Sequence, residues 1–427
     1  MSEVEKLKRV IPLWGSIALV LNGLIGAGIF ALPGAAAAKL GSYSPLVFVV
    51  CATMMLPVFM SVGSVASHFD KTGGPVEYTR HAFGPFWSFV TGWLFYFGGI
   101  AAMSANTNAF VNYLGTYWDW FGGGAGRLFM ISAVCLILTF INVIGVKQGV
   151  RTLYIFSLLK LGPLALVVLF GLATLHLHPI TASVLPPPST FSQALVLVVY
   201  AFVGFEWALV PAGESKNPKR DIPRALLFTL LGTTLLYVVI QFICVAALDN
   251  PGASKAPLAD VARVLWGPAG AVLLTAAAIF SIAGNLSGSM LSVPRLTYSL
   301  AHHGALPEAL GRVHEKYKTP WISIIFLGML VFCLASSGSF IWLAGIASLA
   351  KMLGYALCIL SSWRLNTGES AIKEGWKLPF FVPVWGLMTC VFLISQVQAS
   401  AWQLLIAYVA VGIIIYFAVT KKKPRVV

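Results

Sequence analysis

Apolar runs of about 20 residues recur from one end of this chain to the other, and they restrict its fold more than any other feature. Each run is long enough to cross the hydrocarbon core of a bilayer as a helix. Only 10% of the residues are charged, against about 25% in a soluble domain. The sequence therefore predicts an all-α membrane protein with about twelve transmembrane helices. We place them at 12–38, 43–66, 85–115, 126–144, 151–176, 190–214, 222–248, 262–301, 320–337, 340–362, 378–396 and 399–420.

The positive charge of the chain is distributed unevenly along these spans. If the N-terminus is cytoplasmic, 21 of the 28 lysines and arginines fall in cytoplasmic segments, and only Arg127, Lys255 and Arg263 fall in external ones. This asymmetry is typical of the positive-inside rule. It predicts that both termini, as tails 1–11 and 421–427, are cytoplasmic. The net charge of +14 then sets orientation in the bilayer, and no nucleic-acid partner is expected.

Two of the spans contain interruptions that a membrane helix should avoid. The first span contains 23-GLIGAGIF-30, with three glycines, and the sixth contains 200-YAFVGFEWALVP-211, with a glycine and a carboxylate. Glycine costs a helix about 1 kcal/mol relative to alanine, and freed backbone polar groups cost several kcal/mol each in hydrocarbon. One such stretch is explained as well by close helix packing. Two at matching positions favour a binding site built from exposed backbone groups.

The two interruptions also suggest an internal repeat. Each would open a set of five spans, 12–176 and 190–362, and an odd number of spans places the two sets in opposite orientations. Paired breaks in inverted repeats indicate a transporter binding site near the bilayer midplane. The predicted architecture is a 5+5 inverted repeat with discontinuous helices 1 and 6, followed by two C-terminal helices within 378–420.

Four segments of the chain resemble the amino acid–polyamine–organocation (APC) transporters, and together they extend over most of its length. They are 23-GLIGAGIFALP-33, 73-GGPVEY-78, 200-YAFVGFEWALVPAGESKNPKRDIPRA-225 and 301-AHHGALPEALGRVHEKYKTPW-321. The resemblance implies a LeuT-type fold. It also implies transport of amino acids or related amines by alternating access.

The resemblance further implies a substrate site at the two breaks. Backbone N–H groups near Gly26–Gly28 would face the substrate carboxylate, helped by the helix dipole, and carbonyl groups from both breaks would accept hydrogen bonds from its ammonium group. Tyr200 matches an aromatic residue that covers the substrate in relatives. The expected substrate-binding residues are Leu24, Ile25, Gly26, Ala27, Gly28, Ile29, Tyr200, Phe202, Val203, Gly204, Asn285 and Ser289.

Three ionisable residues within the spans are candidates for coupling or gating. Glu206 is an intramembrane acid, which indicates function, although it could also be a structural acid tied to neighbouring hydroxyl or backbone groups. The resemblance places Lys160 where other members bind sodium, bridging carbonyls of helix one to helix eight; burial disfavours its charged form, so it could also release a proton. The alternative is a lysine that reaches the interface. Lys351 matches no family motif, and could pair with Glu206 or face an aqueous vestibule.

The resulting hypothesis is a sodium-independent secondary transporter of neutral or hydrophobic amino acids, working by alternating access and proton-coupled or exchanging, in a bacterial-type plasma membrane. Two alternatives stay open: a carrier of cationic amino acids or polyamines that uses Glu206 as counter-charge, and an amino acid sensor that does not transport. The predicted partners are a small amino acid substrate, protons in one version, and the lipid bilayer. The oligomeric state is left open.

An enzyme is not expected, because the chain has no HExxH motif, no nucleophile elbow and no pair of catalytic acids. The six cysteines lie within apolar spans without CxxC spacing, so they are interpreted as small core residues. Neither a metal site nor a cofactor is expected.

Overall fold

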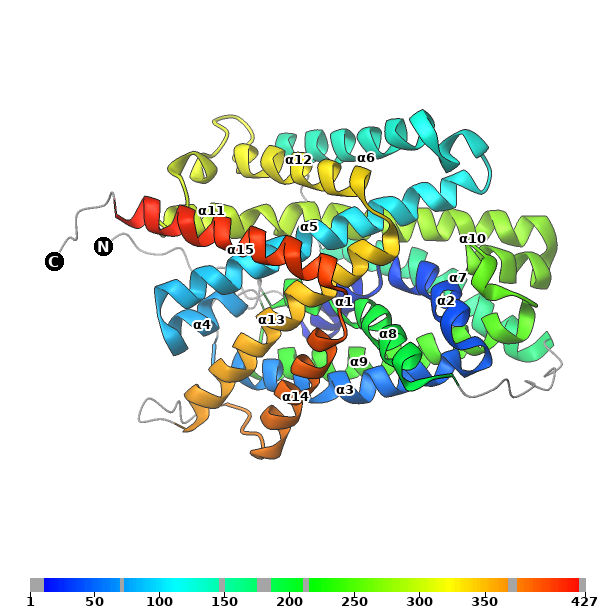
Figure 1. The fold of residues 1–427 in the computed structure, drawn as a ribbon, viewed down its shortest axis with the longest axis horizontal. Coiled ribbons are helices and arrows are strands. Elements are labelled where there is room, and N and C mark those ends of the chain that lie inside the picture. The colour runs from blue at the N-terminus through cyan, green and yellow to red at the C-terminus, as the bar shows by residue number, and fades with distance from the viewer. Residues whose placement is uncertain are drawn as a thin grey trace.

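The structure is a computed structural model that describes residues 11–69, 73–145, 150–174, 186–209, 215–367 and 375–421. Within these ranges the protein is helical, and its one β-like contact is an isolated bridge between Ile11 and Ser215. Most helices lie roughly along the long axis of the molecule (Figure 1). The predicted all-α fold class is confirmed. The predicted tails 1–11 and 421–427 lie outside the described residues except at Ile11 and Lys421.

Each of the twelve expected spans contains helix. The elements are α1 (Leu13–Leu24), α2 (Gly28–Leu40), η1 (Gly41–Tyr43), α3 (Ser44–Ala66), α4 (Pro75–Phe83), α5 (Pro85–Gly115), η2 (Asp119–Gly122), α6 (Gly124–Ile144), α7 (Val150–Thr174), α8 (Pro188–Val199), η3 (Tyr200–Phe202), η4 (Phe205–Ala208), α9 (Pro218–Ala247), η6 (Pro251–Ala253), α10 (Pro257–Ser292), α11 (Pro294–His302), η7 (Glu308–Gly311), α12 (Trp321–Ser337), α13 (Phe340–Thr367), α14 (Phe381–Ser395) and α15 (Ala399–Thr420). Among the described residues, eight helical segments are long and apolar enough to cross a membrane, and four shorter apolar helices accompany them. The chain is a multi-pass membrane protein.

The first and sixth spans are both discontinuous. The first consists of α1 and α2, separated by residues 25–27. In the sixth, α8 gives way to the 3-10 turn η3, an extended Val203, and then η4. The exact bounds of the two predicted repeats stay a prediction.

The eighth span differs from its expected bounds at both ends. It begins at Pro257 and turns at Gly267, whose φ of 68° interrupts the helix ahead of Pro268. It ends at Ser292, and the short α11 follows from Pro294. A proline has no N–H to continue the hydrogen-bond ladder, so the boundary falls there.

Burial separates central helices from peripheral ones. Most of α5 and α13 is buried, and these two helices pack against each other at the centre of the bundle. By contrast, α6 and α15 bury little of their apolar surface and expose large side chains such as Phe140 and Ile414. Such faces are suited to contact with lipid tails.

The two ends of the bundle are built differently. The short helices α4 and α11 lie toward one end, and α2 lies toward the other (Figure 1). At the α2 end, η6 packs closely on α2, since a Cβ on Gly252 would lie 2.7 Å from the Cα of Ala38. A Cβ on Gly34 would lie 3.0 Å from the carbonyl oxygens of Pro251 and Ser254. This contact covers α2 at that end.

Candidate substrate site

The two helix breaks are in direct backbone contact. A Cβ on Gly23 would lie 2.4 Å from the carbonyl oxygen of Gly204, and a Cβ on Gly204 would lie 2.3 Å from the carbonyl oxygen of Gly23. Gly204 also has a φ of 116°, which residues with a Cβ rarely adopt. Only glycine at both positions allows this approach. The glycines therefore join the two breaks into one site.

The hydrogen-bond ladder of the first span is interrupted where the sequence predicts. The N–H of Gly26 turns to the carbonyl of Leu24 at 3.0 Å, and the ladder resumes where Phe30 and Ala31 both donate to the carbonyl of Ala27. No described residue accepts a hydrogen bond from the N–H of Ile29. Unsatisfied N–H groups at a helix start, together with the helix dipole, favour an anionic group.

A cavity of about 20 Å³ lies between the breaks. Eight of the predicted substrate-binding residues line it: Leu24, Gly26, Gly28, Tyr200, Val203, Gly204, Asn285 and Ser289. The wall is completed by Lys351, Gly23, Gly99, Ala102, Asn106 and Trp207. Ile25, Ala27, Ile29 and Phe202 were expected in the site but do not line this cavity. Phe202 is fully buried and packs edge-on against Tyr237.

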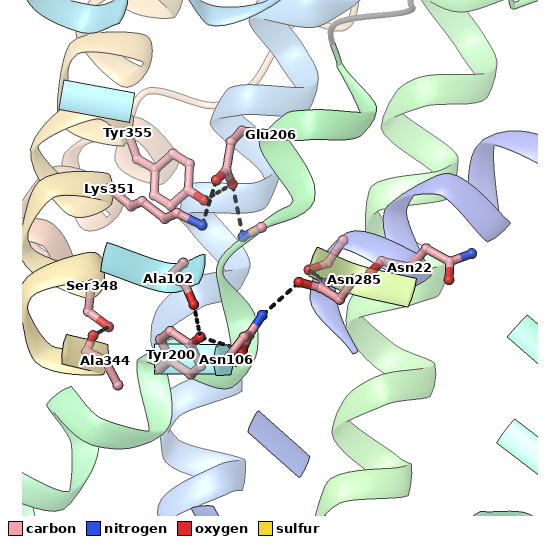
Figure 2. A network of polar contacts seen from close by, with 12 residues as sticks. Asn22, Ala102, Asn106, Tyr200, Glu206, Asn285, Ala344, Ser348, Lys351 and Tyr355 are labelled. Carbon is pink, nitrogen blue, oxygen red and sulfur yellow. Dashed lines mark hydrogen bonds and ion pairs between the residues drawn. The ribbon is translucent and has the colours of Figure 1, made fainter. Parts of the chain in front are cut away.

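A chain of polar side chains crosses the site between the two breaks (Figure 2). Asn106 is at its centre: its Oδ1 lies 2.8 Å from the hydroxyl of Tyr200, which can also donate to the carbonyl of Ala102 at 3.0 Å. The Nδ2 of Asn106 donates to Oδ1 of Asn285 at 2.8 Å. The Nδ2 of Asn285 in turn donates to the carbonyl of Asn22 at 2.9 Å. Side chains of α5, α10 and η3 thus meet the backbone of α1.

Sequence reasoning missed Asn106, although a signal was present. The segment 104-SANTN-108 puts several polar residues in the middle of an apolar span, and intramembrane polar residues tend to be functional. In the structure Asn106 is buried, and its Oδ1 also accepts a hydrogen bond from the N–H of Ala27 at 3.3 Å.

Glu206 belongs to a second buried polar group (Figure 2). Its Oε1 lies 2.8 Å from Nζ of Lys351, and its Oε2 accepts hydrogen bonds from the N–H of Gly204 at 2.9 Å and from the hydroxyl of Tyr355. The Lys351 ammonium lies 5.9 Å from the ring centre of Trp207. All charges of this group are paired. Lys351 lines the cavity, whereas Glu206 does not.

Tyr355 could not have been found from the sequence. It is a single tyrosine in an apolar helix, and only the packing of α13 against η4 brings its hydroxyl to Glu206.

Lys160 of α7 is fully buried and donates to the carbonyl of Ile25 at 2.8 Å. About one turn earlier on the same helix, the hydroxyl of Ser157 accepts a hydrogen bond from Nδ2 of Asn22 at 2.8 Å. Lys160 therefore does not reach the interface, and it contacts the first break, as the resemblance to APC transporters implies. The expected second anchor, on helix eight, is not among its contacts within the described part of the chain.

Within the described ranges, no group of three or more His, Cys, Asp or Glu side chains lies close enough together to hold a metal ion.

Comparison with known families identifies the chain. A family model described as "Amino acid permease" matches residues 11–419. The chain belongs to the amino acid permease family. This confirms the resemblance to APC transporters, and because the permeases are transporters, the protein is not an enzyme.

The permease is similar along its length to several curated bacterial transporters. It is 28% identical to the serine/threonine exchanger SteT of Bacillus subtilis (strain 168), over 99% of both chains. It is 24% identical to the branched-chain amino acid permease BcaP of the same organism, over 99% of this chain and 95% of that one. The L-asparagine permease of Escherichia coli (strain K12) is 25% identical over 90% of this chain and 81% of its own length.

Proposed function

We propose that this permease is a sodium-independent carrier of neutral amino acids that works by alternating access in a bacterial plasma membrane, with both termini cytoplasmic. The observation on which the proposal mainly rests is the asparagine pair that bridges the two helix breaks. The uneven distribution of lysine and arginine supports the orientation. The named substrates of the relatives SteT, BcaP and the asparagine permease, which are neutral amino acids, support the substrate class.

The asparagine pair makes the contacts that a zwitterion would make. Oδ1 of Asn106 accepts a hydrogen bond from the N–H of Ala27, as a carboxylate would. Nδ2 of Asn285 donates to the carbonyls of Asn22 and Gly23, at 2.9 and 3.4 Å, as an ammonium group would. The pair thus offers an acceptor and a donor at opposite ends of the break. An amino acid backbone has the same polarity and is complementary to the same groups.

Substrate and asparagine pair exclude each other in this geometry. The cavity holds about 20 Å³, which is room for about one water molecule and far too little for an amino acid. A Cβ on Gly26 would lie 3.1 Å from Cγ of Asn285 and 3.3 Å from Nδ2 of Asn106, so the amides already cover the glycine-rich turn. We infer that an amino acid binds by displacing the two amides from the backbone groups of the first break.

The ion pair favours a neutral substrate over a cationic one. The Glu206 carboxylate has Lys351 at 2.8 Å, so its charge is already balanced and is not free to act as counter-charge. A cationic side chain in the cavity would instead meet the Lys351 ammonium, which lines it, and like charges repel in a low-dielectric site. The polyamine or cationic amino acid alternative is disfavoured on these grounds.

Lys160 supports sodium independence. Its ammonium group bonds to the carbonyl of Ile25 in the first break and is buried there. A fixed cation at this position supplies the positive charge that a bound metal ion would otherwise bring.

Uptake into proteoliposomes containing the full-length protein tests the proposal. The panel contains labelled serine, threonine, leucine, asparagine, arginine and putrescine, each measured in sodium and in choline buffer. We expect uptake of at least one neutral amino acid, unchanged when choline replaces sodium. Preferred uptake of arginine or putrescine, or a requirement for sodium, would contradict the proposal. Saturable binding of a neutral amino acid without any flux would identify a sensor instead.

A further inference from the structure

A large cavity lies away from the candidate substrate site. It has a volume of about 980 Å³ and is formed by α4, the start of α5, the ends of α6, α10 and α15, α11, and the loop before α12. This is within the usual range for a small-molecule site. It shares no described residue with the cavity between the helix breaks, and no described residue of α1, α2, η3 or η4 lines it. It is therefore a separate site.

Three cationic side chains line this cavity: Arg80 of α4, Arg295 of α11 and Lys318 of the loop. Among the described residues, none of the three side chains makes an ion pair or a hydrogen bond. Glu77 is the single carboxylate of the lining, and its Oε1 lies 3.3 Å from Nδ1 of His81. The lining thus has an excess of uncompensated positive charge, which favours an anionic ligand.

The backbone at Lys318 is held in an unusual conformation. Lys318 is the one non-glycine residue with positive φ in the described part of the chain, at 54°. A tight turn fixes it: the N–H of His314 donates to the carbonyl of Thr319 at 2.8 Å, and the N–H of Lys318 donates to the carbonyl of His314 at 2.9 Å. The hydroxyl of Thr319 anchors the turn to the carbonyl of Val143 at the end of α6. Glycine would adopt this conformation without strain, yet the position holds a lysine that lines the cavity.

An apolar part of the lining suits an acyl chain. Phe89, Leu296 and Leu300 give it an apolar wall, and Tyr416 belongs to the end of α15. The helices α6 and α15, whose ends contribute to the cavity, bury the least of their apolar surface and so face the lipid. In the orientation proposed above, this end of the bundle is cytoplasmic.

We propose that this cavity binds an anionic glycerophospholipid of the cytoplasmic leaflet. Arg80, Arg295 and Lys318 contact the phosphate and the polar headgroup attached to it, and the apolar wall contacts the first part of an acyl chain. Arginine is suited to phosphate because it can donate two parallel hydrogen bonds. Basic pockets between membrane helices on the cytoplasmic side are a known form of lipid-headgroup site. The bound lipid would hold α4, α11 and the loop 312–320 together.

Native mass spectrometry of the delipidated full-length protein tests the proposal. Phosphatidylglycerol and phosphatidylcholine of identical acyl chains are titrated separately, and inorganic phosphate is added as a competitor. The variants are Arg295→Gln and Lys318→Gly; the second removes the charge while keeping the backbone conformation. Lys316→Gln is the matched control, because Lys316 is an exposed lysine of the same loop that does not line the cavity.

We expect phosphatidylglycerol to bind preferentially, and each test variant to weaken that binding about tenfold, the effect of losing one charge-assisted hydrogen bond. Lys316→Gln should bind as the unmodified protein does. Equal binding of phosphatidylcholine would overturn the proposal. So would test variants that bind like the control, or complete displacement by inorganic phosphate, which would indicate a soluble anion. Circular dichroism of each variant checks its helix content. Because the transport assay is separate, failure of either proposal leaves the other standing.

Discussion

The buried ion pair between Lys351 and Glu206 is unusual at the level of single residues, because two charges within a membrane are costly to desolvate. The structure offsets this cost with additional partners. Glu206 accepts hydrogen bonds from the N–H of Gly204 and from Tyr355, and the Lys351 ammonium lies near the face of the Trp207 ring. The carboxylate therefore holds η4 against α13. Its role includes fixing the shape of the second break.

Replacing one partner of this pair should be more damaging than replacing both. Glu206→Gln leaves the Lys351 charge buried without a counter-charge. We expect the free energy of unfolding to fall by about 3–5 kcal/mol. The measurement is the thermal unfolding midpoint in detergent. The double variant Glu206→Gln/Lys351→Met removes both charges and should recover most of that midpoint. A double variant as unstable as the single one would show that charge pairing is not the reason for the loss.

At the scale of helices, the spans and the positions of both breaks could be predicted from the sequence. Their signals are local: an apolar run long enough to span the bilayer and glycines within it. The bounds of the eighth span were less predictable. Its apolar pattern continues to residue 301, whereas the helix ends before Pro294 and a short separate helix follows.

The contact between the two breaks predicts the effect of adding a single methyl group. In Gly204→Ala the new Cβ would lie 2.3 Å from the carbonyl oxygen of Gly23, at a φ of 116°. The two breaks must separate to make room for this methyl group. We therefore expect a lower thermal unfolding midpoint and a loss of amino acid uptake into proteoliposomes.

The matched control for this variant is Gly232→Ala in α9, where a Cβ would meet nothing within 4 Å. That variant should keep its uptake, and its stability should be unchanged or higher by up to about 1 kcal/mol from helix propensity. Equal effects of the two substitutions would argue against a special role of the break.

For the whole molecule, the asparagine pair bears on how the carrier returns after releasing its substrate. The backbone groups at a break must stay satisfied while the site passes through the membrane interior, because each unsatisfied group costs several kcal/mol there. Asn106 and Asn285 satisfy the N–H of Ala27 and the carbonyl of Asn22. If the protein is the carrier proposed above, these hydrogen bonds allow it to reorient without a bound substrate. Net uptake is then possible alongside exchange.

Asn285→Ala should slow the reorientation of the empty carrier more than it slows the exchange of one substrate molecule for another. It leaves the carbonyls of Asn22 and Gly23 without this donor, at a cost of about 1–3 kcal/mol. The ratio of net uptake to counterflow in proteoliposomes should fall about 5- to 150-fold. Asn366→Ala is the control, because Asn366 bonds to Ser64 and Ser362 and does not line the cavity. An unchanged ratio in Asn285→Ala would contradict this account.

The sequence by itself determined that the chain crosses a membrane as helices, and where two of those helices break. These properties depend on runs of neighbouring residues, through apolar length and the missing Cβ of glycine. Only the tertiary structure decided which side chains meet at the breaks. Asn106 and Asn285 are far apart in the chain, as are Glu206 and Tyr355, and their contacts depend on how each helix is rotated and packed. That rotation follows from the packing of all the helices together, which no local pattern specifies.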